Sequence, residues 1–222
     1  RLAEFCVYGF PEEFIREFAL GRSRYRTGDL AWRVTCVDDG AVLSYGGRKL
    51  RTILTPGHTP GHMCLYDAAD KVMFLGDHVL FDITPNITAW PGFKDSLGAY
   101  VNSLLDISGY DVDVALPGHR GVTGSMSDRI GAIIEHHGRR VRELADVLDD
   151  HPGETAYQLA GHLSWNIRFN GDWECFPLEQ KFFAVGETRA HLDYLVIRGR
   201  AVRERCGKAD CYFPVNIKSA LS

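Results

Sequence analysis

Hydrophobic and polar residues alternate over short runs in the first half of the chain and follow a helical period in the second half. Turn signals such as Asp39-Gly40 and Gly46-Gly47 separate the alternating runs, a combination that predicts strands. We expect an antiparallel meander with strands at residues 32–37, 41–45, 49–54, 63–66 and 71–75. A helix at 95–107 and one more strand at 112–116 follow.

The rest of the chain is predicted to be mostly helical. Apolar residues from Ile130 to Leu148 keep a 3.6-residue period after a cap near Ser127, and further helices are expected at 155–163 and 177–195. Strands at 201–205 and 212–215 flank the turn 207–210. Helices closed by such a hairpin are typical of a winged-helix-like module. We therefore predict two domains, 1–124 and 125–222, the first opening with a short helix at 11–18.

Composition narrows the function classes. A chain of 222 residues with 45% hydrophobic and 24% charged residues is typical of a soluble globular protein. The net charge of -4 gives no general attraction to nucleic acid or anionic lipid. No apolar run approaches the roughly 20 residues that span a bilayer, so we expect no membrane association. Six scattered cysteines predict reduced thiols and a cytoplasmic location.

Three hydrophobic runs end in the same way, at a glycine followed by a potential metal ligand. These ligands are His58, Asp77 and His119, separated by 19 and 42 residues. Ligands at successive strand ends are what a metal site at one edge of a sheet requires. Imidazole nitrogen and carboxylate oxygen suit zinc, iron or manganese, and a carboxylate can bridge two cations. We predict that His58 and His119 are terminal ligands and that Asp77 bridges.

Several nearby residues are candidates for supporting roles. His62 and His78 are interpreted as residues that orient the ligands or form groove walls, and Asn86 as part of the cleft wall. For Trp90 the pattern leaves both a pocket lining and core packing open. Outside this region, we expect a structural role for His191 and a solvated helix face for His136 and His137, because adjacent helix residues cannot chelate together.

Taken in order, Thr-Pro-Gly-His-Thr, Leu-Gly-Asp-His and Leu-Pro-Gly-His resemble the second, third and fourth metal motifs of the metallo-β-lactamase superfamily. This group includes thioesterases, lactonases and nucleases. The resemblance covers roughly residues 30–125, and the helical tail looks like the C-terminal appendage of lactamase-like hydrolases. It implies an α/β (α+β) fold of the αββα sandwich type. It also implies two divalent metal ions, with zinc preferred over iron or manganese.

One family motif, His-x-His-x-Asp-His, occurs nowhere in the 222 residues. In the family it precedes the Thr-Pro-Gly-His turn and lies on the other half of the sandwich. Together with the start at Arg1, this predicts that the N-terminal half of the sandwich lies upstream of the given sequence. The general acid or base belongs to that motif in many relatives, so the catalytic residues stay unassigned.

The resemblance implies a hydrolase that uses a metal-activated water. We expect a small ester, thioester or lactone as the substrate. A second hypothesis is a metal-dependent ribonuclease whose C-terminal domain grips nucleic acid through Arg203 and Arg205. A third is a non-catalytic binding protein with an incomplete metal site. The helical domain is expected to cover the cleft or to mediate a homodimer.

Overall fold

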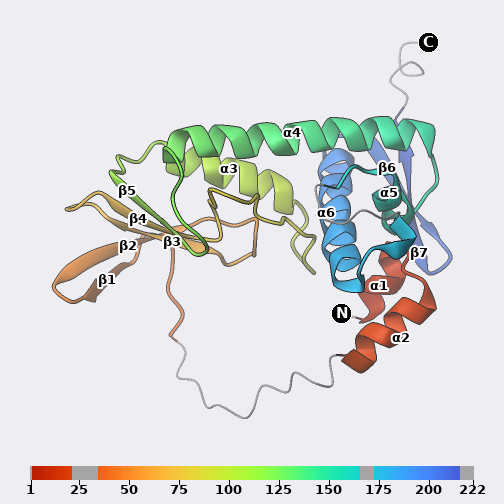
Figure 1. Ribbon diagram of the computed structural model, residues 1–222, viewed down its shortest axis with the longest axis horizontal. Helices are drawn as coiled ribbons and strands as arrows, with labels where there is room; N and C mark the ends of the chain where they lie inside the picture. The colour runs from red at the N-terminus through yellow and green to blue at the C-terminus, as the bar shows by residue number, and fades with distance from the viewer. Residues whose placement is uncertain (1, 22–34, 166–172, 216–222) are drawn as a thin grey trace. The chain divides into compact units, whose positions relative to one another are not determined.

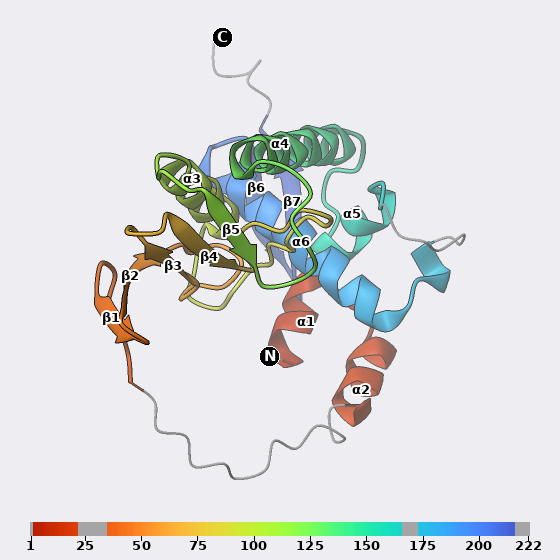
Figure 2. The same cartoon turned by 60° about the vertical axis from the view of Figure 1, so that its left-hand side comes forward.

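A computed structural model describes residues 2–21, 35–165 and 173–215. They fall into two compact units (Figure 1, Figure 2). One unit comprises residues 34–139, and the other comprises residues 1–33 together with 140–222. The long helix α4 begins in the first unit and ends in the second.

The unit 34–139 is built on one five-stranded sheet with the order β1-β2-β3-β4-β5. Its strands are β1 Val42–Tyr45, β2 Arg48–Leu54, β3 Met63–Asp67, β4 Val72–Gly76 and β5 Val114–Pro117. Strands β1 to β4 pair antiparallel, which confirms the predicted meander, whereas β5 lies parallel to β4. The connection between β4 and β5 contains helix α3, Ser96–Ser108, which begins where Asp95 accepts a hydrogen bond from the backbone N–H of Gly98.

The expected strand at 32–37 is not formed where the structure describes it. Residues 32–34 lie outside the described residues, and residues 35–37 are irregular. The backbone of β2 finds other partners at this edge. Thr52 exchanges backbone hydrogen bonds with Gly40 and Ala41, and the side chain of Asp39 accepts from the N–H of Leu54. A turn with one side-chain acceptor thus replaces the strand that alternation alone predicted.

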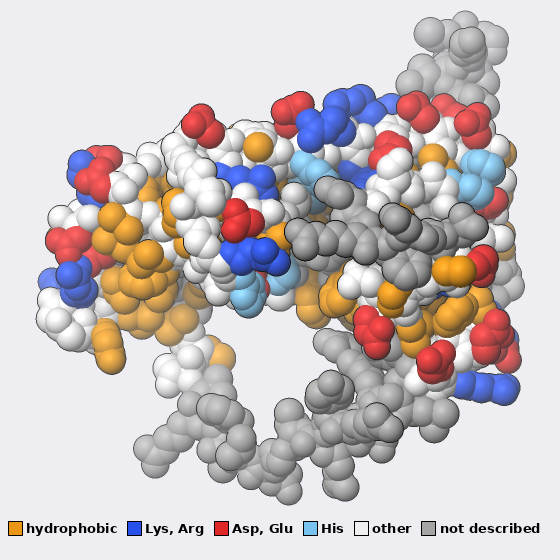
Figure 3. Space-filling view, in the orientation of Figure 1, with side chains coloured by type: hydrophobic (Ala, Val, Ile, Leu, Met, Phe, Trp, Pro, Cys, Tyr) orange, Lys and Arg blue, Asp and Glu red, His pale blue; other side chains and the backbone are white. Residues whose placement is uncertain are grey.

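The two faces of this sheet differ in burial. Ile53, Cys64 and Met73 lie on one face and are buried, as are the core residues of α3. Cross-strand register places Leu54, Phe74 and Leu116 on the opposite face, and all three are exposed. Figure 3 shows hydrophobic side chains gathered over this part of the molecule. Among the described residues, the second face is therefore an apolar surface that remains open to solvent.

The second unit contains helices and a two-stranded hairpin. Its elements are α1 Leu2–Tyr8, α2 Glu12–Gly21, the end of α4 Met126–Asp150, α5 Ala156–His162, the short helix η2 Trp173–Cys175, α6 Leu178–Ile197, β6 Ala201–Cys206 and β7 Ala209–Pro214. The predicted helices and hairpin are present, and α1 is an additional element. The assignment to the winged-helix class stays a prediction.

The compact units do not follow the expected boundary between residues 124 and 125. Helix α1 packs in the helical unit, where the ring of Phe5 lies 5.5 Å from that of Phe182 and the ring of Phe10 lies 5.1 Å from that of Tyr157. Burial of such an aromatic side chain stabilises by about 1.5–3 kcal/mol, which outweighs the weak local preference of a short segment. Packing rather than chain order therefore groups these residues, and the domain boundary itself stays a prediction.

Candidate metal centre

The structure brings together the side chains of His58, Asp77 and His119. The Nε2 atom of His58 lies 3.7 Å from Oδ2 of Asp77, and Nε2 of His119 lies 3.2 Å from Oδ1 of the same carboxylate. His58 follows β2, and Asp77 and His119 follow the adjacent parallel strands β4 and β5. Topology thus delivers residues 19 and 42 positions apart to one edge of the sheet.

Two glycines allow this close approach. Gly57 has a φ of 144° and lies against α3, where an added Cβ would sit 2.6 Å from the Cα of Tyr100. Gly118 donates a backbone hydrogen bond to the carbonyl of Gly76 at 2.7 Å, and a Cβ on it would lie 2.8 Å from Oδ1 of Asp77. Cβ atoms essentially never approach other heavy atoms this closely, so a side chain at 118 would displace the carboxylate or the strand end.

The ring of His58 is oriented by contacts on the side away from Asp77. Its Nδ1 lies 2.9 Å from the backbone carbonyl of Asn86, an acceptor that fixes the proton on Nδ1. The Nε2 lone pair therefore faces the carboxylate side and is available to a cation. The indole N–H of Trp90 donates to the His58 carbonyl at 3.0 Å. Asn86 thus contacts His58 through its backbone rather than its side chain, and its place in a cleft wall stays a prediction.

His62 supports Asp77 from behind. Its Nε2 accepts the backbone N–H of Asp77 at 3.2 Å, so the proton of the neutral ring is on Nδ1, which donates to Oγ1 of Thr55 at 2.7 Å. Burial and the neighbouring His58 lower the pKa of His62, which keeps the ring neutral in this arrangement. His62 therefore uses both nitrogens to position the backbone that carries Asp77.

His78 is buried beneath this layer. Its ring lies 5.7 Å from that of His62 and 5.1 Å, edge to face, from that of Tyr100, whose hydroxyl donates to the His78 carbonyl at 2.6 Å. Burial lowers the pKa of His78 to about 3, so the side chain packs as a neutral ring. Tyr100 is fully buried, as expected for a core residue.

The donor set fits divalent cations. Two ligands of a tetrahedral zinc ion, each bound at about 2.0–2.1 Å, lie about 3.3 Å apart. The 3.2 Å and 3.7 Å separations are close to that value. Because the two histidines face different oxygens of Asp77, the arrangement suits a carboxylate that bridges two cations. Two nitrogens and two oxygens are fewer than the roughly eight ligand positions of two tetrahedral ions, so water, substrate or further side chains have to fill the rest.

The sequence interpretation missed some features of this region. Thr55 is a buried residue whose hydroxyl orients His62, and its position directly after β2 was the available signal. The expected solvated face at His136 and His137 is wrong for His137, which is 2% exposed and packs its ring against Tyr100 at 5.6 Å. His137 lies four residues after Ile133 and four before Val141, so the apolar stripe of α4 contains it.

His191 has the structural role that was expected. It is fully buried in α6, and its Nδ1 lies 2.8 Å from the carbonyl of Glu187 one turn earlier. All six cysteines are free thiols. No helix within residues 2–21, 35–165 and 173–215 is long and apolar enough to cross a membrane.

Comparison with known proteins decides the family. The sequence model of the metallo-β-lactamase superfamily matches residues 6–119, about half of the chain and the whole stretch that carries His58, Asp77 and His119. The chain belongs to the metallo-β-lactamase superfamily. This agrees with the mixed α/β fold and with the order of the strand-end motifs.

Named relatives and solved structures support this placement in the metallo-β-lactamase superfamily. The chain is 30% identical over 136 residues to beta-lactamase-like protein 2 homolog of Caenorhabditis elegans, an alignment that covers 60% of this chain and 44% of the relative. It is 29% identical to lactamase-like protein aptB of Emericella nidulans, covering 50% and 34% respectively. Among solved structures, a metallo-beta-lactamase family protein from Thermus thermophilus has a TM-score of 0.75 at 28% identity, covering 95% of this chain and 62% of that one.

A beta-lactamase domain protein from Burkholderia ambifaria is also similar, with a TM-score of 0.71 at 27% identity, over 82% of this chain and 53% of that one. The chain thus spans less than half of the curated relatives named above and under two thirds of the two solved structures. The likeness to the Thermus protein extends over the helical unit as well as the sheet.

Proposed function

We propose that this chain supplies metal ligands to a metal-dependent hydrolase that acts on a small ester, thioester or lactone. The observation that carries the proposal is the carboxylate of Asp77 facing His58 with one oxygen and His119 with the other. Membership of the metallo-β-lactamase superfamily, whose members are generally hydrolytic, supports it. Two divalent metal ions, with zinc preferred over iron or manganese, suit these nitrogen and oxygen donors.

When bound, the metal ions supply a water of lowered pKa and a positive charge that stabilises the oxyanion of a reacting carbonyl. The residues of this chain hold and orient the ligands. Asn86 keeps the Nε2 lone pair of His58 directed toward Asp77, and His62 anchors the backbone N–H of Asp77. His119 is 64% exposed at its side chain, so the site opens toward solvent on that side.

The helical unit offers little support for the ribonuclease alternative. The guanidinium group of Arg203 lies 3.0 Å from a carboxylate oxygen of Asp193, and that of Arg205 lies 2.9 Å from one of Asp210. A phosphate backbone would have to compete with these internal ion pairs. The loop between β4 and α3, which brings Trp90 against the backbone of His58, instead favours a compact substrate beside the metal site. Free thiols, three of them exposed, support a cytoplasmic location.

Metal analysis combined with a substrate panel tests the proposal. The Asp77 site of the full-length protein containing this chain should hold about two zinc equivalents, and His58→Ala and Asp77→Ala should each reduce the zinc content. His136→Ala, a histidine outside the site, is the control and should leave the content unchanged. Purified protein is then assayed on thioesters, lactones, phosphodiesters and β-lactams. Unchanged metal content in both ligand variants, or hydrolysis of phosphodiesters alone, would contradict the proposal.

A further inference from the structure

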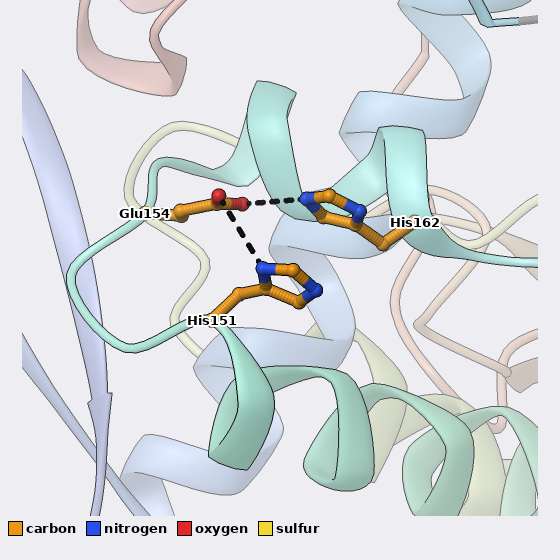
Figure 4. A group of neighbouring side chains, drawn as sticks. All are labelled: His151, Glu154 and His162. Carbon is orange, nitrogen blue, oxygen red and sulfur yellow. Dashed lines mark hydrogen bonds and ion pairs between the residues drawn. The ribbon is translucent and has the colours of Figure 1, made fainter.

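A second group of potential metal ligands lies in the helical unit. His151, Glu154 and His162 surround one another, with Nδ1 of His151 3.7 Å from Oε1 of Glu154 and Nε2 of His162 3.0 Å from Oε2 (Figure 4). One ligand atom from each residue can be chosen so that all three lie within 4.8 Å of one another. The group belongs to the unit formed with residues 140–222, whereas the Asp77 site belongs to the unit 34–139.

The three residues come from well-fixed positions. His151 follows the last residue of α4 and donates its backbone N–H to the carbonyl of Val147, which continues the helical pattern by one residue. His162 is the last residue of α5. That helix begins at a capping box, in which Thr155 and Gln158 satisfy each other's backbone N–H groups.

The short loop between the two helices is held by β7. The backbone N–H of Gly153 donates to the carbonyl of Tyr212 at 2.7 Å, and the N–H of Tyr212 donates to the carbonyl of Glu154 at 3.0 Å. The loop therefore carries Glu154 at a set position relative to both histidines. Because the backbone that carries the three residues is fixed, only their side chains have to rearrange when they bind a cation, which favours a specific site over a chance contact.

We propose that His151, Glu154 and His162 bind one divalent transition-metal ion, with Zn²⁺ as the preferred ion, and thereby clip the end of α4 to α5. The ligand set is two imidazole nitrogens and one carboxylate, a combination common in protein sites for zinc and related metals. Water molecules complete the coordination. Two further carboxylates, Asp149 and Asp150, directly precede His151 and favour the approach of a cation.

Binding requires a defined change in the rings. The imidazoles of His151 and His162 stack with centroids 3.8 Å apart and planes within 8°. A bound cation lies in the plane of each imidazole that holds it, along the nitrogen lone pair, so the two rings have to rotate out of the parallel stack. The histidine side chains are 39% and 38% exposed, which leaves room for this rotation. Ligand atoms also have to approach to about 3.3 Å from one another, the spacing around a tetrahedral ion.

The ion pairs of Glu154 with His151 and His162 contribute little to the stability of the folded unit. Exposed pairs of this kind contribute about 0–1 kcal/mol in proteins. A metal ion that bridges three residues on two helices and a loop would stabilise the folded unit in proportion to its concentration. The inference does not depend on the proposed hydrolase activity, because it concerns a different unit and a different measurement.

Zinc titration of the metal-stripped chain separates the two sites. Calorimetry with ZnCl₂ is carried out on the wild type, His162→Gln, Glu154→Gln and the control His136→Gln. We expect His162→Gln and Glu154→Gln to lose one zinc equivalent or to bind it at least about tenfold more weakly. His136→Gln should match the wild type. Glu154→Gln keeps the backbone contact to Tyr212 and an acceptor for His162, so its loss of zinc would not arise from misfolding.

A variant that lacks the Asp77 site makes the test of zinc binding by His151, Glu154 and His162 independent of the hydrolase proposal. Asp77→Ala should retain one zinc equivalent, and the double variant Asp77→Ala with Glu154→Gln should lose it. Co²⁺ in place of Zn²⁺ should give visible absorption bands from histidine coordination in the first of these proteins and none in the second. Equal zinc stoichiometry and affinity in the wild type, His162→Gln and Glu154→Gln would overturn the inference, as would Asp77→Ala that binds no zinc.

Discussion

The two histidine clusters each contain two imidazoles and one carboxylate but differ in the contacts that support them. In each, one carboxylate faces two histidines through separate oxygens, at 3.7 Å and 3.2 Å around Asp77 and at 3.7 Å and 3.0 Å around Glu154. Ligand type and spacing therefore do not distinguish them. The difference lies in the contacts that hold the imidazoles in place.

Around Asp77 the orientation is set by hydrogen bonds behind the ligands. A carbonyl fixes the proton on Nδ1 of His58, and the ring of His62 anchors the N–H of Asp77 itself. Around Glu154 the two rings instead rest on each other, and their stack has to open before a cation can bind. Preorganised ligands bind metal more tightly because less ordering is required on binding. We therefore expect the Asp77 site to bind zinc more tightly than the Glu154 site.

A pair of reciprocal substitutions gives the largest expected effect. Asp77→Asn removes the charge and one bridging oxygen, so the Asp77 site should lose its metal and any hydrolytic activity should fall by more than about a hundredfold. Glu154→Gln should leave that activity within about twofold, because exposed ion pairs contribute little to folding. Metal content and initial rates of the full-length protein are the measurements. Equal losses in the two variants would show that the clusters are not separate sites.

The buried thiol of Cys64 should make the free energy of unfolding of the unit 34–139 decrease at alkaline pH. Burial raises the pKa of the Cys64 thiol from 9.0 to about 11. The folded state thus holds this proton more tightly than the unfolded state, so its contribution is complete below pH 9 and is lost as the pH rises from 9 to 11. The loss is on the order of 2–3 kcal/mol.

Denaturant unfolding at several pH values measures this effect. Cys64→Ala should flatten the dependence of the free energy of unfolding on pH between pH 9 and 11, although it lowers stability at every pH. Cys36→Ser, which changes an exposed thiol, is the matched control and should keep the wild-type slope. Parallel curves for Cys64→Ala and the wild type would contradict the assignment.

Gly118→Ala tests whether the strand ends need the close approach. The added Cβ would lie 2.8 Å from Oδ1 of Asp77 and 3.0 Å from the backbone carbon of Gly76, so the carboxylate has to move. We expect the affinity of the Asp77 site for zinc to fall about tenfold, as for other changes beside a ligand. Gly121→Ala, where an added Cβ meets nothing within 4 Å, should bind as the wild type does. An unchanged affinity in Gly118→Ala would show that the contact is not needed.

Thr55→Val should have the smallest effect. It keeps the shape of the side chain but removes the hydroxyl that accepts from Nδ1 of His62, which should lower the free energy of unfolding by about 1 kcal/mol. Thr59→Val, in the same loop, is the control. Chemical denaturation measures the stability, and nitrogen chemical shifts of His62 report its tautomer. A His62 ring that keeps its Nδ1 proton with no loss of stability would show that Thr55 is not its partner.

The sequence predicted that the side chains of His58, Asp77 and His119 converge, because each follows a local pattern, while their role as metal ligands stays a prediction. A hydrophobic run that stops at a glycine before His58, Asp77 or His119 is visible without coordinates, and the sheet topology then brings the three side chains together. The sequence did not predict features that depend on tertiary contacts. Helix α1 has only seven residues and is held by aromatic packing, and the carbonyl that orients His58 comes from a loop residue 28 positions away.

The contact among His151, Glu154 and His162 in the helical unit is another feature that the sequence did not predict. The pattern places His151 where one helix ends and His162 near the end of the next, with Glu154 between them. Nothing in that spacing predicts that the two rings stack. The contact arises because α5 folds back after the loop that β7 holds, which is a property of packing rather than of local sequence.

The main-chain contact between position 86 and the ring of His58 has an evolutionary consequence. Every amino acid provides a carbonyl, so the side chain at 86 can vary without releasing the imidazole, provided that the loop keeps its path. Under the proposed function, replacement of side chains in this loop can therefore change substrate specificity while the imidazole of His58 keeps its orientation. Insertions or deletions that reroute the backbone would instead release the imidazole and, under the proposed function, change substrate choice and metal retention together.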